Sequence, residues 1–110
     1  MINKVYGLLG LMARARKITY GADACLEEIK KKKIKLVLVA QDASEKTKKN
    51  FRYYCTENQI PIVFYGEIDN LSKAIGKSNK AIIGIKDSGV AQQIQKMIDR
   101  LAEIKIDTEK

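Results

Sequence analysis

The chain has 110 residues, of which 45% are hydrophobic, and a formal net charge of +8 at pH 7. No apolar run approaches the ~20 residues of a membrane span, and no charged leader precedes an apolar segment with a small-residue cleavage site, so we expect a cytoplasmic protein without membrane contact. With no histidine and two cysteines, the chain lacks the commonest general base and the ligands of a zinc site, and we expect neither metal nor cofactor.

A helix, a short extended segment and a second helix are predicted at the start of the chain. Apolar residues at helical spacing indicate an amphipathic helix over residues 3–14, and residues 18–20 form a brief extended piece. Gly21 then opens a helix that runs to about residue 32, and no serine or threonine stands in the usual capping position. The apolar faces of these helices consist of Ile2, Val5, Tyr6, Leu9 and Met12, and of Ala22, Cys25, Leu26 and Ile29.

An unbroken aliphatic run over residues 36–40 is the centre of the predicted fold. The run lacks the alternation of a sheet with one wet face, so it predicts a strand that is covered on both sides. Ser44 is placed to cap a helix over residues 44–57, and a second strand follows over residues 60–65.

The rest of the chain predicts a short helix, a strand and a long helix. The short helix covers residues 69–75 and stops at Gly76, and the strand covers residues 81–85. Asp87 or Ser88 caps the last helix. Because helices and strands alternate throughout, we expect a three-layer α/β/α sandwich. The apolar face of the last helix consists of Val90, Ile94, Met97, Ile98 and Leu101.

The net charge is segregated within the chain. Residues 1–55 hold thirteen Lys or Arg and five Asp or Glu, a balance of +8, whereas residues 56–110 hold eight of each. This segregation favours a surface that faces a polyanion such as nucleic acid. Simple solubility and an acidic protein surface are the alternatives.

Two basic segments each admit two interpretations. Arg14, Arg16 and Lys17 close the first helix, where cations either complement the helix dipole or contact phosphates. The lysines within residues 30–35 are open to the same two interpretations. Gly21 leaves backbone N–H groups open and admits the close approach that an anion or an RNA backbone would use.

No constellation of catalytic residues is visible in the sequence. Cys25 and Cys55 are expected to be buried free thiols, and Gly-Lys-Ser at residues 76–78 lacks the upstream glycine of a phosphate loop. Asp42 follows the central strand and is interpreted as a loop carboxylate that accepts hydrogen bonds from local backbone N–H groups. We therefore expect a protein that is not an enzyme.

Three segments in order resemble the kink-turn-binding ribosomal-protein family. They are residues 21–29, which open a helix, residues 35–44, which form a strand and its polar exit, and residues 71–76, which read Leu-Ser-Lys-Ala-Ile-Gly. The arginine-rich residues 8–17 are similar to its small bacterial branch, the YlxQ-type proteins.

The resemblance implies an α/β/α fold with a mixed four-stranded sheet and recognition of a kink-turn, an RNA helix bent beside tandem sheared G·A pairs. In the family a glycine-led helix enters the major groove at the kink, and the loop after the short helix packs over bulged nucleotides. The family's asparagine, glutamate and lysine that read the G·A pairs fall on Asp23, Ala24 and Glu27, so Gly21 alone matches. We therefore expect affinity to depend more on phosphate contacts.

We expect residues 1–110 to form a single RNA-binding domain of the kink-turn-binding ribosomal-protein type. Its partner would be kink-turn-like or ribosomal RNA, bound by a monomer that is a candidate for association with the ribosome. The alternative is a protein-interaction adaptor, associated with the ribosome or the transcription machinery, in which RNA reading is reduced. The expected RNA-binding residues are Arg14, Arg16, Lys17, Gly21, Asp23, Lys31, Lys77, Ser78, Asn79 and Lys80.

Overall fold

A mixed sheet of four strands forms the middle layer of the computed structural model, which describes residues 3–108. The strands are β1 (Ile18–Tyr20), β2 (Leu36–Val39), β3 (Ile62–Phe64) and β4 (Ile82–Ile85), in the spatial order β1-β4-β2-β3. β4 runs antiparallel to both β1 and β2, whereas β2 and β3 are parallel. This confirms the mixed four-stranded sheet that the resemblance implied.

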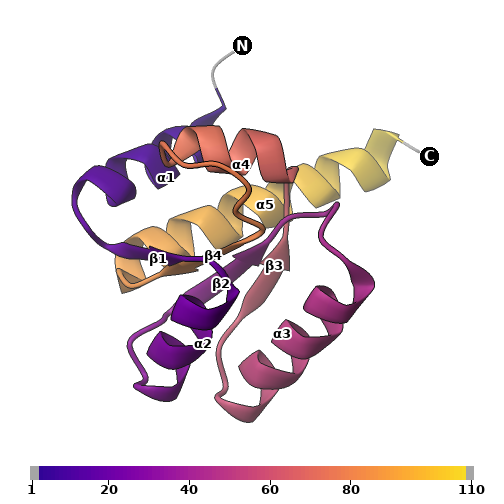
Figure 1. Ribbon diagram of the computed structural model, residues 1–110. Helices are drawn as coiled ribbons and strands as arrows, with labels where there is room; N and C mark the ends of the chain where they lie inside the picture. The colour runs from indigo at the N-terminus through magenta and orange to yellow at the C-terminus, as the bar shows by residue number, and fades with distance from the viewer. Residues whose placement is uncertain (1–2, 109–110) are drawn as a thin grey trace.

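Five helices cover the two faces of the sheet (Figure 1). α1 (Lys4–Arg14), α4 (Ile68–Ala74) and α5 (Ser88–Thr108) lie together on one face, and α2 (Ala22–Lys30) and α3 (Glu45–Glu57) lie on the other. The predicted three-layer α/β/α sandwich is therefore confirmed. Among the described residues, no helix is both long and apolar enough to cross a bilayer.

The aliphatic run that predicted a central strand is covered on both sides. β2 lies between β4 and β3, and all four of its residues are buried. Its centre pairs Val37 with Gly84 of β4 and with Ile62 of β3. Since side chains of a strand point alternately to opposite faces, β2 supplies apolar contacts to both helical layers.

Most helix boundaries follow the predicted caps. The Ser44 hydroxyl accepts a hydrogen bond from the Thr47 N–H at 3.1 Å, and the Asp87 carboxylate accepts one from the Val90 N–H at 2.9 Å. α2 ends two residues earlier than predicted, because Lys32 adopts a left-handed conformation with φ 61° and turns the chain toward β2. β3 is also shorter than the predicted residues 60–65.

Two predicted apolar faces are only partly buried. Leu101 in α5 is 49% exposed, and Ala22, the first residue of α2, is exposed. The predicted face of α1 is largely correct, with Val5, Leu9 and Met12 buried. Ile2 lies outside the described residues.

A glycine sets the distance between α1 and α4. A Cβ atom built on Gly10 would lie 2.9 Å from the carbonyl oxygen of Ala74, closer than a side chain tolerates. The two helices therefore pack with backbone almost against backbone, and their C-terminal ends lie near one another (Figure 1).

Candidate functional site

Three segments that are distant in the sequence meet at one corner of the protein. They are the end of α1, strand β1, and the loop of residues 76–80 between α4 and β4, which enclose a hollow of about 410 Å³. Antiparallel pairing places Tyr20 opposite Ile83, so the end of β1 lies beside the start of β4. We call this space the tyrosine hollow; its lining comprises Ala13, Arg14, Arg16, Ile18, Tyr20, Ile75, Gly76 and Lys77.

The N-terminus of α2 begins at the same corner, directly after Tyr20. Gly21 is the N-cap, with φ 90°, a conformation that residues with a side chain rarely adopt, and no side chain caps the helix. The Gly21 N–H donates to the carbonyl of Ile82 at 2.9 Å, which fixes the helix start to β4. The uncapped start that the sequence predicted is therefore present, and its first-turn N–H groups have no side-chain acceptor. Asp23 lies exposed in this first turn.

Tyr20 is the residue of this corner that the sequence interpretation missed. The ammonium groups of Lys77 and Lys80 lie 5.2 Å and 5.5 Å from the centre of its ring, within the range of cation–π attraction. Side chains alternate along β1, so Tyr20 lies on the same face as Ile18, toward α1 and α4. This alternation in the segment before Gly21 is the sequence feature that could have identified Tyr20.

The loop of residues 77–80 is held by one buried serine. Ser72 of α4 is 2% exposed, and its hydroxyl accepts a hydrogen bond from the Lys80 N–H at 2.8 Å while donating to the Lys80 carbonyl at 3.3 Å. The Lys77 N–H also donates to the Ser72 carbonyl at 2.8 Å. Gly76, with φ 71°, ends α4 in the left-handed conformation that the sequence predicted. Ser78 and Asn79 are exposed at the tip of this fixed loop.

The two arginines at the end of α1 lie on the wall of the tyrosine hollow. Arg14 and Arg16 are both exposed, and within the described side chains no carboxylate lies close enough to pair with either. Arg16 has φ 60° and occupies the position after a helix where glycine is usual. These cations are therefore exposed, and none of the described carboxylates serves as a counter-ion to them.

Two of the predicted RNA-binding residues are engaged elsewhere. The Lys17 ammonium lies 3.2 Å from the Asp87 carboxylate, and that carboxylate also accepts from the Val90 N–H. The Val90 N–H and then the Lys17 ammonium hold the pKa of Asp87 below its ordinary value. Lys31 lies 3.1 Å from Glu27 at the far end of α2, about 15 Å of helix away from Gly21.

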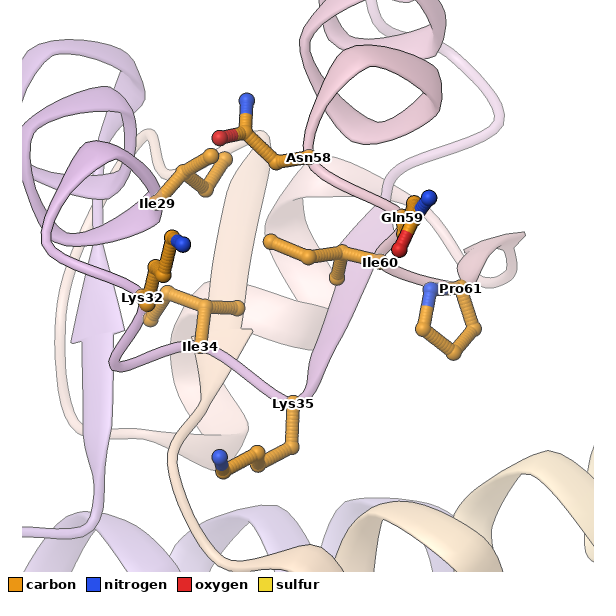
Figure 2. Close-up of a pocket in the computed structure, with 8 residues that line it drawn as sticks. All are labelled: Ile29, Lys32, Ile34, Lys35, Asn58, Gln59, Ile60 and Pro61. Atoms are coloured by element: carbon orange, nitrogen blue, oxygen red, sulfur yellow. The ribbon is translucent and has the colours of Figure 1, made fainter.

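A second basic hollow, of about 310 Å³, lies at that far end, between the C-termini of α2 and α3 (Figure 2). Its floor is apolar, with Ile29, Ile34 and Ile60 directed into the space between the helix ends. Lys32 and Lys35 stand on its rim, but Figure 2 shows the Lys35 ammonium directed away from Ile60. We call this space the lysine hollow; Asn58, Gln59 and Pro61 complete its lining.

The two cysteines are buried in the core, and Asp42 is held by a backbone hydrogen bond. Burial raises the pKa of Cys25 to about 12 and that of Cys55 to about 11, so both thiols stay protonated at neutral pH. Both are buried and free, as predicted. The Asp42 carboxylate accepts from the Ile68 N–H at 2.8 Å, so its acceptor role is as predicted, but its partner is 26 residues away rather than local.

Residues 3–95 match one protein family, described as the ribosomal protein L7Ae/L30e/S12e/Gadd45 family. Two curated relatives carry the name RNA-binding protein YlxQ. The one from Bacillus subtilis (strain 168) is 33% identical over 97 residues, which cover 86% of this chain and 94% of that protein. The one from Enterococcus faecium is 33% identical over 96 residues, which cover 87% of this chain and 92% of that protein.

Two solved structures share the fold. A protein of unknown function from Bacillus halodurans C is 35% identical, with a TM-score of 0.84, and the match covers 87% of this chain and 97% of that one. The Giardia lamblia 15.5kD RNA binding protein is 22% identical, with a TM-score of 0.76 and 92% of both chains covered. The second similarity concerns the fold alone.

Proposed function

Because the chain belongs to the ribosomal protein L7Ae/L30e/S12e/Gadd45 family, we propose that it is a non-catalytic protein that binds structured, kink-turn-like RNA. The observation that carries this proposal is the corner at which the uncapped start of α2 lies beside the loop of residues 77–80. The curated relatives named as RNA-binding proteins support it. The protein would act as a cytoplasmic monomer, with kink-turn-like or ribosomal RNA as its target.

The physical basis is the shape of a bent RNA helix. A-form RNA has a major groove too deep and narrow for side chains to read, and a sharp kink opens it. The N-terminus of α2 then presents backbone N–H groups and the positive end of a helix dipole to phosphates. Lys77 and Lys80 add positive charge from the neighbouring loop, which Ser72 holds in place.

Base reading along α2 is reduced relative to the family pattern. Ala24 has no polar group in its side chain, and the Glu27 carboxylate is paired with Lys31 rather than directed alone at the RNA. Asp23 remains able to accept a hydrogen bond from a guanine edge. Most of the affinity would therefore come from phosphate contacts and most of the selectivity from the kinked shape, which binding stabilises.

The test compares a kink-turn RNA with the same RNA in which Watson–Crick pairs replace the G·A pairs. We expect tighter binding to the kink-turn at matched salt, because only that RNA bends readily at the docking point. Equal affinity for the two RNAs would reduce the role to generic RNA binding. Affinity should fall with salt by roughly 0.7–0.9 log units per phosphate contact for each tenfold increase.

The departures of Ala24 and Glu27 from the family pattern favour a second candidate function, that of a protein-interaction adaptor. If RNA reading has decayed at Ala24 and Glu27, partners would be held by protein contacts. Pull-down from a lysate with and without nuclease separates the candidates. Loss of ribosomal partners after nuclease treatment is expected for the RNA-binding protein, and retention is expected for the adaptor.

A further inference from the structure

We propose that the lysine hollow docks an extended, acidic segment of a partner protein, one apolar side chain of which enters the space between the ends of α2 and α3. This inference goes beyond the proposed function, because it concerns a protein partner and the opposite end of α2 from Gly21. RNA and protein would then occupy the two ends of one helix.

The first argument is the apolar floor between the two helix ends. Ile29, Ile34 and Ile60 are directed into the hollow, whose volume of about 310 Å³ lies at the lower limit for ligand pockets (Figure 2). Ile29 and Ile34 are buried, whereas Ile60 is half-buried and Pro61 is exposed. One aliphatic side chain fits this space, whereas an amphipathic helix needs a longer groove with anchors over two turns.

The second argument is the balance of charge around this floor. Four exposed lysines lie at the end of α2 and in the turn to β2, and no carboxylate among the described side chains pairs with them. Glu57, at the end of α3, and the partial charges of two helix C-termini oppose them and leave a balance of about +2. That balance favours an acidic partner. The four lysines are Lys30, Lys32, Lys33 and Lys35.

The third argument is the polar chemistry of the lining, which fits a peptide better than a phosphate backbone. Asn58 and Gln59 contribute side-chain amides, and an amide both donates and accepts hydrogen bonds, as a peptide group does. The Asn58 Nδ2 donates to the Tyr54 carbonyl at 2.8 Å, which leaves its Oδ1 to accept from a peptide N–H. The last carbonyl groups of both helices also need N–H donors, which a peptide backbone supplies and a phosphate group lacks.

The fourth argument is the backbone conformation at both helix ends. Lys32 follows α2 with φ 61°, and Gln59 follows α3 with φ 56°, in the left-handed conformation where glycine is usual. A residue with a side chain is less stable than glycine in this conformation. Both residues line the hollow, so the strain occurs where their side chains are available for a contact that glycine could not make.

The experiment adds a synthetic peptide, Asp-Glu-Asp-Leu-Asp-Glu-Asp, to the isotope-labelled full chain and follows the backbone amides by nuclear magnetic resonance. We expect the amide shifts to cluster at residues 29–35 and 57–61, with micromolar to submillimolar affinity. Replacing the leucine of the peptide with glycine should weaken binding at least about fivefold, because the floor loses its apolar contact. A peptide with lysine in place of each acidic residue should not bind.

The chain offers a matched pair of variants for the same titration. Lys32→Glu with Lys35→Glu should weaken peptide binding at least about fivefold, because two attractive contacts become repulsive. Lys46→Glu with Lys49→Glu reverses the same charge on exposed residues of α3 that do not line the hollow. This control should change peptide binding less than about twofold at physiological salt. Thermal unfolding of each variant reports whether the fold is retained.

Several outcomes would overturn the inference. Absence of binding at millimolar peptide, equal binding of the leucine and glycine peptides, or equal losses in the two lysine variants would leave only general charge attraction. Displacement of the peptide by heptauridylate, a single-stranded RNA of equal length, would assign the hollow to RNA. Protein saturated with kink-turn RNA should still bind the peptide with unchanged affinity. Failure to prefer the kink-turn would remove the proposed function and leave this docking site standing.

Discussion

The tyrosine hollow and the lysine hollow differ in the helix ends around them, although both are basic. The tyrosine hollow is lined by Tyr20, which directly precedes the uncapped N-terminus of α2 at Gly21. The lysine hollow lies between the C-termini of α2 and α3, whose carbonyl groups carry the opposite partial charge. The comparison teaches that a count of lysines does not locate an anion site, because each helix end adds about half a charge of its own sign.

A second difference between the two hollows is how firmly the cations are placed. Lys77 and Lys80 converge on one aromatic ring from a loop anchored by Ser72. At the lysine hollow, by contrast, Lys35 is directed away from the floor, and neighbouring Lys31 is paired with Glu27. Preorganised charge binds a phosphate at a lower entropic cost than flexible surface charge.

The largest expected effect is on RNA affinity, in a comparison of two double variants that remove the same amount of charge. Lys77→Gln with Lys80→Gln should weaken binding to the kink-turn RNA by about 100-fold, because two charge-assisted contacts of about 1.5 kcal/mol each are lost. Lys32→Gln with Lys35→Gln should weaken it by less than about threefold. Fluorescence anisotropy at fixed salt measures both. Similar losses would mean that net charge, and not the corner, drives binding.

The next effect concerns the anchor of the loop. Ser72→Ala leaves the part-buried N–H and carbonyl of Lys80 without their partner, so the free energy of unfolding should fall by about 1–2 kcal/mol. Affinity for RNA should fall as well, since the loop loses its fixed position. Urea denaturation and anisotropy measure the two quantities. Ser78→Ala, at the exposed tip of the same loop, is the control and should alter unfolding by less than about 0.5 kcal/mol.

A smaller effect separates folding from binding at the two hollows. Arg16 and Lys32 both follow helices in left-handed conformations, with φ 60° and 61°. Replacing either with Gly relieves strain and should raise the free energy of unfolding by about 0.5–1 kcal/mol. RNA affinity should fall only for Arg16→Gly, because only that side chain lines the tyrosine hollow. A parallel loss for Lys32→Gly would contradict the distinction between the hollows.

The smallest effect is a pH dependence at Asp87. Its pKa is lowered below 3.8 in the folded protein by the Val90 N–H and Lys17, so its stabilising contribution is present above that value and is lost as pH falls through the folded pKa. Urea midpoints between pH 2 and pH 5 should therefore fall less steeply for Asp87→Asn than for the unmodified protein.

The same variant tests whether added positive charge alone raises the affinity for RNA. Asp87→Asn raises the net charge by one unit and releases Lys17. RNA affinity at neutral pH should change by less than about threefold, since Lys17 does not line the tyrosine hollow. A tenfold gain would show that any added cation near α1 is sufficient.

Local patterns predicted the fold well because they depend on neighbours in the sequence. The aliphatic run of β2, the Ser44 cap and the Gly76 stop each follow from residue type and spacing alone. The boundary of α2 was wrong because a left-handed Lys32 is not apparent from a lysine-rich segment.

The candidate site was predicted less well because it depends on pairing between distant segments. The uncapped start at Gly21 was visible in the sequence, whereas the meeting of Tyr20 with Lys77 requires the antiparallel pairing of β1 and β4. Lys17 was assigned to RNA because its partner, Asp87, lies 70 residues away. The pairing of Lys31 with Glu27 could have been anticipated from their spacing of four residues.

The close backbone contact between α1 and α4 links the spacing of these two helices to the shape of the corner where they end. The contact between Gly10 and Ala74 sets the spacing of α1 and α4. Each helix leads into a residue that lines the tyrosine hollow, Arg16 after α1 and Gly76 after α4. A methyl group added at Gly10 would meet the Ala74 carbonyl oxygen at 2.9 Å and the Arg14 guanidinium at 3.8 Å, so it would press on the helix spacing and on one wall of the hollow together.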